Sequence, residues 1–465
     1  MFSFCDPKTT DCHRRDFLRI GTLGLGGLSL AHLLGLRAKA EARTPLTDRS
    51  VIFVFQHGGP SQFETFDPKM TAPEGIRSTT GEIATTLPGI TFGSTFPQLA
   101  KRAHQLAVVR SYVPGDANHD AKPIVHRETL GANLGSFYAR VVGLNHPATG
   151  IPTNMLLYPQ ALGPGAQPPV QGLGNFPATG PLGSAYAPFL PGGGGDLQKN
   201  MRLTIARDRL DDRRALLTQF DTLRRKLDHL GALESMDRFT AQAFDVILRG
   251  VADAFDLSKE AAKLVARYDT APLVNIDSID KKWNNRKYYI DHARSLGKLL
   301  LLARRLCEAG CGFITVNTNF VWDMHSDANN APPAEAMPYV GGPFDHAVSA
   351  LIDDLEARGL SDRVLVVCCG EMGRTPRVNK KGGRDHWGNL GPLLLYGGGL
   401  KMGLVIGSSA HDGGTPTSDP VTIRNLIATI MHTLFNIGEV RLLPGISGDV
   451  SRVITEGDPI RQLME

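Results

Sequence analysis

The 465-residue sequence contains few cysteines, and their positions exclude two classes of protein. Two of the six cysteines lie within the first twelve residues, and Cys368 and Cys369 are adjacent, so we expect no disulfide framework. Cys307 and Cys311 could form a bridge, but four residues apart at the end of a helix it would be strained. No CxxC pair is present, which excludes zinc ribbons. We expect the cysteines outside the N-terminal segment to be structural thiols.

The sequence also lacks a marked excess of positive or negative charge. Outside residues 1–40 the chain has 44 basic and 43 acidic side chains and no basic stripe, so we expect no nucleic-acid partner. The apolar content of 42% is enough for a sizeable core. The 51 glycines and 30 prolines indicate many turns and long loops, where functional sites are usually built.

Residues 1–42 have the organisation of an export signal followed by a linker. The segment contains, in order, Arg14-Arg15, Phe17-Leu18, a mild apolar stretch from Ile20 to Leu36, and Ala38-Lys39-Ala40. It resembles the twin-arginine signal, whose translocon carries folded proteins. A membrane anchor is the alternative, but the apolar stretch is shorter than the roughly 20 residues that usually span a bilayer. We therefore expect a bacterial protein that is periplasmic or secreted, with the translocon as its partner during export.

Short apolar runs without alternation predict strands that are covered on both faces. They are Val51 to Phe55, "QLAVVRS", "GFITVNT", "RVLVVCCG" and "PLLLYGGG". Helical patterns cover Tyr289 to Glu308, Phe344 to Arg358 and Pro420 to Phe435. This order predicts an α/β doubly wound fold, with a mostly parallel sheet flanked by helices.

Residues 50–465 are expected to form one domain with two additions. Residues 150–200 are rich in proline and glycine and predict a long excursion over the surface. Residues 200–270 have leucines near helical spacing and predict an inserted helical cap, or equally a bundle for self-association, so the oligomeric state stays open.

Ligands of an open α/β sheet bind beyond the carboxyl ends of its strands, and unusually polar residues follow the predicted strands here. They include His57, Ser61, Ser111, His119, Asp323, His325, Glu371 and His386. Asp323 and His325 are two apart, so in extended chain both project to one side and could reach one cation. Histidine and carboxylate side chains are the ligands of catalytic zinc, iron or manganese, and His386 would supply a third ligand.

Arg374 and Arg384 lie in the same loop as His386. Their guanidinium groups could bind a phosphate, sulfate or carboxylate of the substrate. They could instead form salt bridges to Glu371 or Asp385, or orient a carboxylate that binds the metal.

Four motifs occur in order behind the export signal: "QHGGPSQFETFDPK", "FVWDMHSD", "GEMGRTPR" and "GRDHWGN". Together they resemble the bacterial family known as domain of unknown function 1501, over nearly the whole chain from about Ser50. That family is grouped with the alkaline phosphatase and sulfatase superfamily. The resemblance implies an α/β sandwich with metal ligands at the carboxyl edge of the sheet. It also implies that Asp323, His325, Glu371 and His386 are ligands.

The chain departs from the superfamily pattern at two ligand positions. Gln56-His57 stands where a metal-binding Asp is expected, and Met372 stands where a His is expected. We therefore expect one metal rather than two, with His57 and His119 as additional candidate ligands. No cysteine outside the signal has the neighbours of the sulfatase nucleophile, which disfavours an ordinary sulfatase. Ser111 or Ser61 could act as the nucleophile.

These residues predict an exported hydrolase of phosphate or sulfate esters that uses a divalent metal ion such as zinc, manganese or calcium. Ser111, Arg374 and Arg384 would be its catalytic residues, and the substrate would be an anionic small molecule or a polysaccharide ester. The alternative is a non-catalytic exported binding or assembly protein on the same fold.

Overall fold

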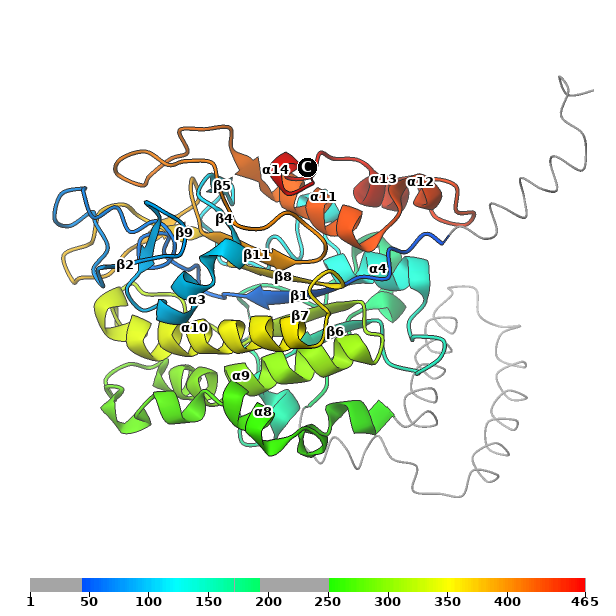
Figure 1. The fold of residues 1–465 in the computed structure, drawn as a ribbon, viewed down its shortest axis with the longest axis horizontal. Coiled ribbons are helices and arrows are strands. Elements are labelled where there is room, and N and C mark those ends of the chain that lie inside the picture. The colour runs from blue at the N-terminus through cyan, green and yellow to red at the C-terminus, as the bar shows by residue number, and fades with distance from the viewer. Residues whose placement is uncertain (1–43, 171, 193–250, 465) are drawn as a thin grey trace, which may run out of the picture.

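The computed structural model describes residues 44–170, 172–192 and 251–464, and a seven-stranded sheet lies at its centre (Figure 1). In spatial order the strands are β12 (Leu404–Ile406), β4 (Ala107–Val109), β11 (Leu393–Gly397), β8 (Val364–Cys369), β1 (Ser50–Phe55), β7 (Phe313–Asn317) and β6 (Asn154–Leu157). The central strand β1 pairs in parallel with both β7 and β8. Each apolar run that predicted a strand contains one.

One strand, β11, runs antiparallel to both of its neighbours, β4 and β8. A parallel return would need a crossover connection, usually a helix, from one edge of the sheet to the other. Between β8 and β11 the chain forms only a hairpin of β9 (Gly373–Arg374) and β10 (His386–Trp387). It therefore re-enters the sheet at the edge it left, in the opposite direction. The fold is mixed α/β with a mostly parallel sheet.

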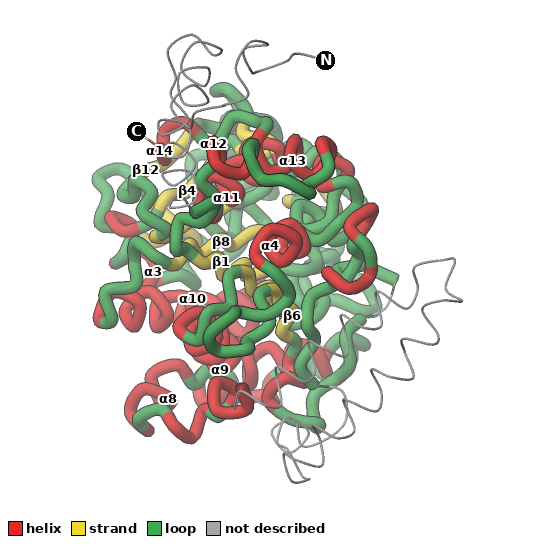
Figure 2. The backbone as a smooth tube through the Cα atoms, turned by 90° about the vertical axis from the view of Figure 1, so that its right-hand side faces the viewer, coloured by secondary structure: helices red, strands yellow, loops and turns green. Residues whose placement is uncertain are grey.

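Helices cover both faces of this sheet, as Figures 1 and 2 show. Successive residues of β1 point to opposite faces. Ile52 belongs to a core cluster with α9 (Arg286–Glu308) and α10 (Pro333–Ala357), whereas Val51 belongs to a cluster with α11 (Ile423–Leu434). Burial on both faces explains why the strands contain no polar alternation.

The other elements are short and lie around this centre. They are β2 (Glu82–Ala84), β3 (Thr91–Gly93), β5 (Tyr112–Val113), β13 (Val421–Thr422), α3 (Pro97–Lys101), α4 (Leu134–Val142), α8 (Ala262–Tyr268), α12 (Ile437–Val440), α13 (Gly448–Thr455) and α14 (Arg461–Met464). The four cysteines of the described ranges are free, as expected.

The described residues 150–170 and 172–192 contain more regular structure than the surface excursion predicted for residues 150–200. The edge strand β6 lies within them and pairs in parallel with β7. All four of its residues are buried, and the strand is too short for a periodic pattern to reveal it.

Two predicted segments lie outside the described residues. They are the export signal at 1–42 and most of the helical cap at 200–270, of which only the part from residue 251 onward is described. Among the described helices, none combines the length and the apolar character needed to cross a membrane.

Candidate metal centre

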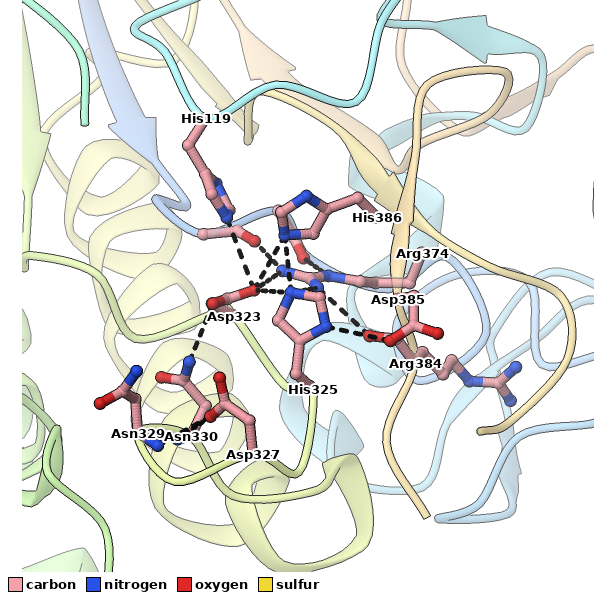
Figure 3. Close-up of polar contacts among 12 residues, drawn as sticks. His119, Asp323, His325, Asp327, Asn329, Asn330, Arg374, Arg384, Asp385 and His386 are labelled. Atoms are coloured by element: carbon pink, nitrogen blue, oxygen red, sulfur yellow. Dashed lines mark hydrogen bonds and ion pairs between the residues drawn. The ribbon is translucent and has the colours of Figure 1, made fainter. Parts of the chain in front are cut away.

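Four side chains from distant parts of the chain converge beyond the carboxyl edge of the sheet (Figure 3). They are His119, Asp323, His325 and His386, and one ligand atom from each lies within 4.8 Å of the others. The Nε2 atoms of His325, His386 and His119 lie 3.0, 3.5 and 3.7 Å from Oδ1 of Asp323. The structure therefore brings together four of the six residues that the sequence predicts as metal ligands.

The sheet register explains this convergence. The last residues of β1, β7 and β8 are register partners, so their following loops start level at one edge. Asp323 and His325 lie in the loop after β7. His386 begins β10 and pairs with Arg374 of β9, which follows β8 directly.

Gly58, in the loop after β1, allows that loop to touch the backbone that carries Asp323. Its φ is +110°, and a Cβ at this position would lie 2.4 Å from the backbone nitrogen of Asp323. Glycine adopts this conformation readily and has no Cβ to collide. The Gly58 N–H also donates to the Glu371 carboxylate, at 2.9 and 3.2 Å. One turn thus fixes both the Asp323 loop and Glu371.

The two oxygens of Asp323 have different partners. Its Oδ2 accepts a hydrogen bond from the Asn330 amide at 2.8 Å, and its Oδ1 accepts one from Arg374 Nη2 at 2.5 Å while facing the three imidazoles. Burial alone would raise the pKa of Asp323. The charge of Arg374 and hydrogen bonds with His325 and His386 outweigh burial and hold that pKa well below its usual range. Asp323 is therefore an ionised carboxylate with one oxygen directed at the cluster.

Two of the imidazoles are oriented by carboxylates on their other nitrogen. His119 Nδ1 lies 2.8 Å from Glu371 Oε1, and His325 Nδ1 lies 3.2 Å from Asp385 Oδ1. Against the effect of burial, hydrogen bonds from Asn379 and His325 lower the pKa of Asp385, so its ionised carboxylate only accepts and His325 Nδ1 carries a proton. Glu371 Oε1 already accepts from the Gly58 N–H, which places His119 Nδ1 as a second donor to it. In a neutral ring with that proton on Nδ1, the lone pair is on Nε2, where a cation between the ring and Asp323 could accept it; without a cation, a proton on Nε2 makes the hydrogen bond to Asp323. Such carboxylate–histidine pairs are typical of metal sites, where they fix the tautomer of the ligand.

The arrangement attracts a positive charge. His325 Nε2 lies 2.6 Å from His386 Nε2, and two nitrogen lone pairs this close need a proton or a cation between them. Burial lowers the pKa of His119 to about 4 and also lowers the pKa of His386. Burial opposes the charge on His325 as well, but its hydrogen bond to Asp323 outweighs burial and the pKa of His325 is raised. Of the three histidines, His325 is therefore the one that binds a proton most readily.

Glu371 is not among the converging side chains, contrary to its prediction as a ligand. Its carboxylate is fully buried behind His119 and accepts hydrogen bonds from Gly58. Burial raises its pKa. Because β8 ends before Glu371 and the turn directs it inward, this residue orients His119 instead of facing the cluster.

His57 is also outside the cluster. Its Nε2 lies 2.8 Å from the Leu173 carbonyl, and its ring packs edge-on against Phe176 and Phe320, with centroids 5.4 and 5.1 Å away. Burial lowers its pKa. His57 is therefore a neutral packing histidine, which corrects its prediction as a ligand.

Arg374 does not offer its guanidinium to a substrate. Its side chain is fully buried, and it donates to the carbonyls of Gly58, Gly59 and Arg384 and to Asp323. Nη1 also lies 3.3 Å from His325 Nε2. In this structure Arg374 holds Asp323 and keeps it ionised. This is the predicted alternative in which an arginine orients a carboxylate of the metal site.

Arg384 is likewise occupied within the protein. It forms a fully buried ion pair with Glu64, with Nε 3.1 Å from Oε2, and its guanidinium lies 4.2 Å from the Phe63 ring centroid. Its remaining donors bind the carbonyls of Thr375, Pro376, Ile76 and Arg77. The predicted substrate contact is therefore wrong, and the partner is Glu64, not Glu371 or Asp385.

Ser111 is fully buried, which contradicts its prediction as a nucleophile. A Cβ at Gly407 would lie 2.2 Å from its hydroxyl oxygen, so the backbone of Gly407 covers the hydroxyl. Ser61, the other candidate, donates its hydroxyl to Glu64 and is also buried.

The sequence interpretation missed Asn330 and the roles of Asp385 and Gly58. Asn330 reaches Asp323 from a turn in which its own backbone N–H donates to Asp327 Oδ1 at 2.7 Å. The sequence predicts Asp385 only as a partner for an arginine. Its position directly before His386 was the signal that it could orient a ligand of the same site.

Comparisons with known proteins give a family and weak structural likenesses. The family model described as "Protein of unknown function (DUF1501)" matches residues 48–464. No curated protein matches the chain. The PsFucS1 sulfatase from Pseudoalteromonas sp. is 12% identical with a TM-score of 0.35, over 92% of this chain and 76% of that one. Ps i-CgsB in complex with k-i-k-neocarrahexaose is 10% identical with a TM-score of 0.32, over 83% of this chain and 71% of that one.

Proposed function

The chain belongs to the DUF1501 family, whose description names no reaction, and from its converging side chains we propose that it is a metal-dependent hydrolase of phosphate or sulfate esters. The observation that carries the proposal is the approach of three imidazoles and one ionised carboxylate to a common point. We further propose an alkaline phosphatase-like doubly wound fold and export by the twin-arginine pathway. The order of the strands and the Arg14-Arg15 segment support these two points.

The chemistry of the donor set favours zinc or manganese over calcium. Three imidazole nitrogens and one carboxylate oxygen suit zinc, and imidazole is a common ligand of other transition metals. Calcium takes six to eight oxygen ligands, and the cluster offers too few. A single metal fits, because Gln56 and Met372 are both buried where the superfamily supplies further ligands.

When bound, a divalent cation would polarise an ester oxygen as a Lewis acid. The chain contributes the fixed geometry. Glu371 and Asp385 orient His119 and His325, and Arg374 keeps Asp323 charged. Because Ser111 and Ser61, the two candidate nucleophiles, are both buried, we propose that water attacks the ester phosphorus or sulfur directly. A new P–O or S–O bond then forms, the bond to the ester oxygen breaks, and the alcohol leaves with a proton.

Metal content and turnover test this proposal together. Wild-type protein should contain about one equivalent of metal, and Asp323→Ala and His386→Ala should lose most of it and all turnover of aryl phosphate or aryl sulfate. His104→Ala is the matched control, because His104 lies before β4 at the opposite edge of the sheet. Full metal retention in both cluster variants would refute the proposal.

A second candidate is a non-catalytic binding or assembly protein that keeps the metal. The burial of Ser111 and Ser61 favours it, because neither serine can act as a nucleophile. Metal-loaded protein that hydrolyses neither ester would support this candidate, and turnover lost in Asp323→Ala would exclude it.

A further inference from the structure

The hairpin beside the metal centre carries exposed positive charges. It holds Arg374 and His386 at its base, and Arg377, Lys380 and Lys381 are exposed toward its tip. These three side chains form no ion pair with residues in the ranges that the structure describes. They therefore present unpaired charge next to the site.

Hydrogen bonds attach the tip of this hairpin to the metal centre. Asn379 Nδ2 donates to the backbone carbonyl of His325 at 3.0 Å and to Asp385 Oδ1 at 3.1 Å. The Lys381 carbonyl accepts from the Ser326 hydroxyl at 2.8 Å. The exposed cations are thus held at a defined position beside a ligand histidine.

A neighbouring loop adds a fourth exposed cation, Arg77. The Val378 N–H donates to the Gly75 carbonyl at 2.8 Å, and the Arg77 carbonyl accepts from Arg384 Nη2 at 3.0 Å. The exposed acidic residues of these two loops are Glu74 and Asp385, and Asp385 already binds His325. We name Arg77, Arg377, Lys380 and Lys381 the cationic strip.

We propose that the cationic strip binds a polyanionic polysaccharide whose ester group enters the metal centre. This inference rests on the proposed function and names its substrate class. Arg374 and Arg384 are buried and occupied, so the charge of a substrate beyond its reacting ester must be met elsewhere. The four cations are exposed on two adjacent loops, so they are available to anionic groups other than the reacting ester.

The strip favours a polysaccharide over a nucleic acid. Proteins that bind single-stranded nucleic acid combine positive charge with exposed aromatic rings on which bases stack. The large apolar side chains that are exposed in the described ranges are Leu130, Leu190, Leu273, Leu442 and Met464, none of which is aromatic. The four strip residues therefore offer charge without rings, and Trp387 of the same hairpin is half-buried, with its Nε1–H donating to the Gly414 carbonyl at 2.6 Å.

Equilibrium binding of dextran sulfate to the full metal-loaded chain tests the proposal, with uncharged dextran and a thymidine oligonucleotide as comparison probes. The variant Arg377→Gln/Lys380→Gln/Lys381→Gln should raise the Kd for dextran sulfate by roughly tenfold, because screened electrostatic attraction falls with each charge lost. The control Lys263→Gln/Lys401→Gln/Arg452→Gln removes the same charge from exposed positions elsewhere and should change the Kd less than about twofold.

Equal binding by the strip variant and the wild type would overturn the inference, as would oligonucleotide binding as tight as that of dextran sulfate. An unchanged Tm and metal content would show that the strip variant is folded. Binding needs no turnover, so the two proposals fail separately. If the protein hydrolyses esters but its binding of dextran sulfate does not depend on the strip, only the polysaccharide inference is refuted. If binding depends on the strip but the protein neither binds metal nor hydrolyses esters, the proposed hydrolase function is refuted.

Discussion

Asp323 shows at the scale of one residue how the site is prepared for a cation. Asn330 and Arg374 hold one oxygen each, and the oxygen bound to Arg374 also faces the histidines. The carboxylate is thus ionised and oriented by the protein itself. Side chains that are already held in position lose less conformational entropy when a metal ion binds, and this favours metal affinity.

Glu371 contacts His119 and not the point where the four side chains meet, so its substitution should affect metal binding only indirectly. Glu371→Gln should weaken metal affinity by about 10- to 100-fold, because the neutral amide no longer imposes one tautomer on His119. Competition with a chromogenic chelator measures the affinity. Glu456→Gln, at an exposed position, is the control. An affinity equal to that of the wild type would show that Glu371 does not orient a ligand.

His292 should make stability depend on pH at a distance from the ligands. It is buried between the Thr318 hydroxyl and the Val340 carbonyl, and burial lowers its pKa from 6.5 to about 4. The unfolded chain therefore binds a proton that the folded chain does not between those pH values. The free energy of unfolding should fall as the pH drops through this window, by up to about 3 kcal/mol.

Urea denaturation with chelator present, from pH 7 to pH 4, measures this dependence without a metal contribution. His292→Gln should reduce the slope, whereas His104→Gln, at an exposed position, should retain it. An unchanged slope in His292→Gln would contradict the assignment.

The sequence predicted the four converging residues because each follows a strand or lies in a loop at the carboxyl edge. It could not predict which way Glu371 and His57 face. That choice depends on the left-handed turn at Gly58 and on aromatic packing from Phe176 and Phe320, which are distant in sequence. The use of Arg384 depends on Glu64, 320 residues away.

At the scale of elements, the loop after β1 and the loop after β7 are closely fitted. Gly58→Ala should destabilise the protein by about 2–4 kcal/mol and reduce metal affinity, because its Cβ would push the Asp323 backbone away. Gly75→Ala is the matched control. Its φ is also positive, at +83°, but a Cβ there meets nothing within 4 Å, so only the backbone cost of about 1–2 kcal/mol applies.

Thermal unfolding and metal titration distinguish the two glycine variants. If both lose equal stability and both keep full metal affinity, the fit between the two loops does not position Asp323.

Helix α10 shows what local patterns miss at this scale. The predicted helix began at Phe344, yet α10 begins at Pro333 and includes Pro338 and Pro343. Proline is favourable in the first turn but removes hydrogen bonds further in, so the pattern gave no reason to start the helix earlier. Packing of α10 against α9 and the sheet compensates for those lost bonds. The antiparallel direction of β11 likewise follows from the short hairpin that joins it to β8, and the apolar residues of β11 itself do not reveal it.

At the scale of the whole molecule, the ends of the sheet differ in chemistry. The loops at the carboxyl edge carry the four converging side chains and the cationic strip, although the chain outside residues 1–40 has almost equal numbers of basic and acidic side chains, 44 and 43.

The N-terminal segment should decide the location of the protein. Arg14→Lys/Arg15→Lys should leave it in the cytoplasm with the leader uncleaved, because the paired arginines are what the translocon recognises. Cell fractionation and N-terminal sequencing measure this outcome, with Arg19→Lys as the control. Recovery of both variants in the membrane fraction would favour the anchor alternative, and equal export of both would refute the twin-arginine assignment.

X-ray absorption at the metal edge of the purified protein tests the central claim most directly. We expect one bound transition metal, with scattering from three imidazoles and one carboxylate oxygen at metal–ligand distances of about 2.0–2.2 Å if the metal is zinc. The imidazole signal should fall in His386→Ala. Protein without bound metal, or a metal shell without imidazole, would contradict the account.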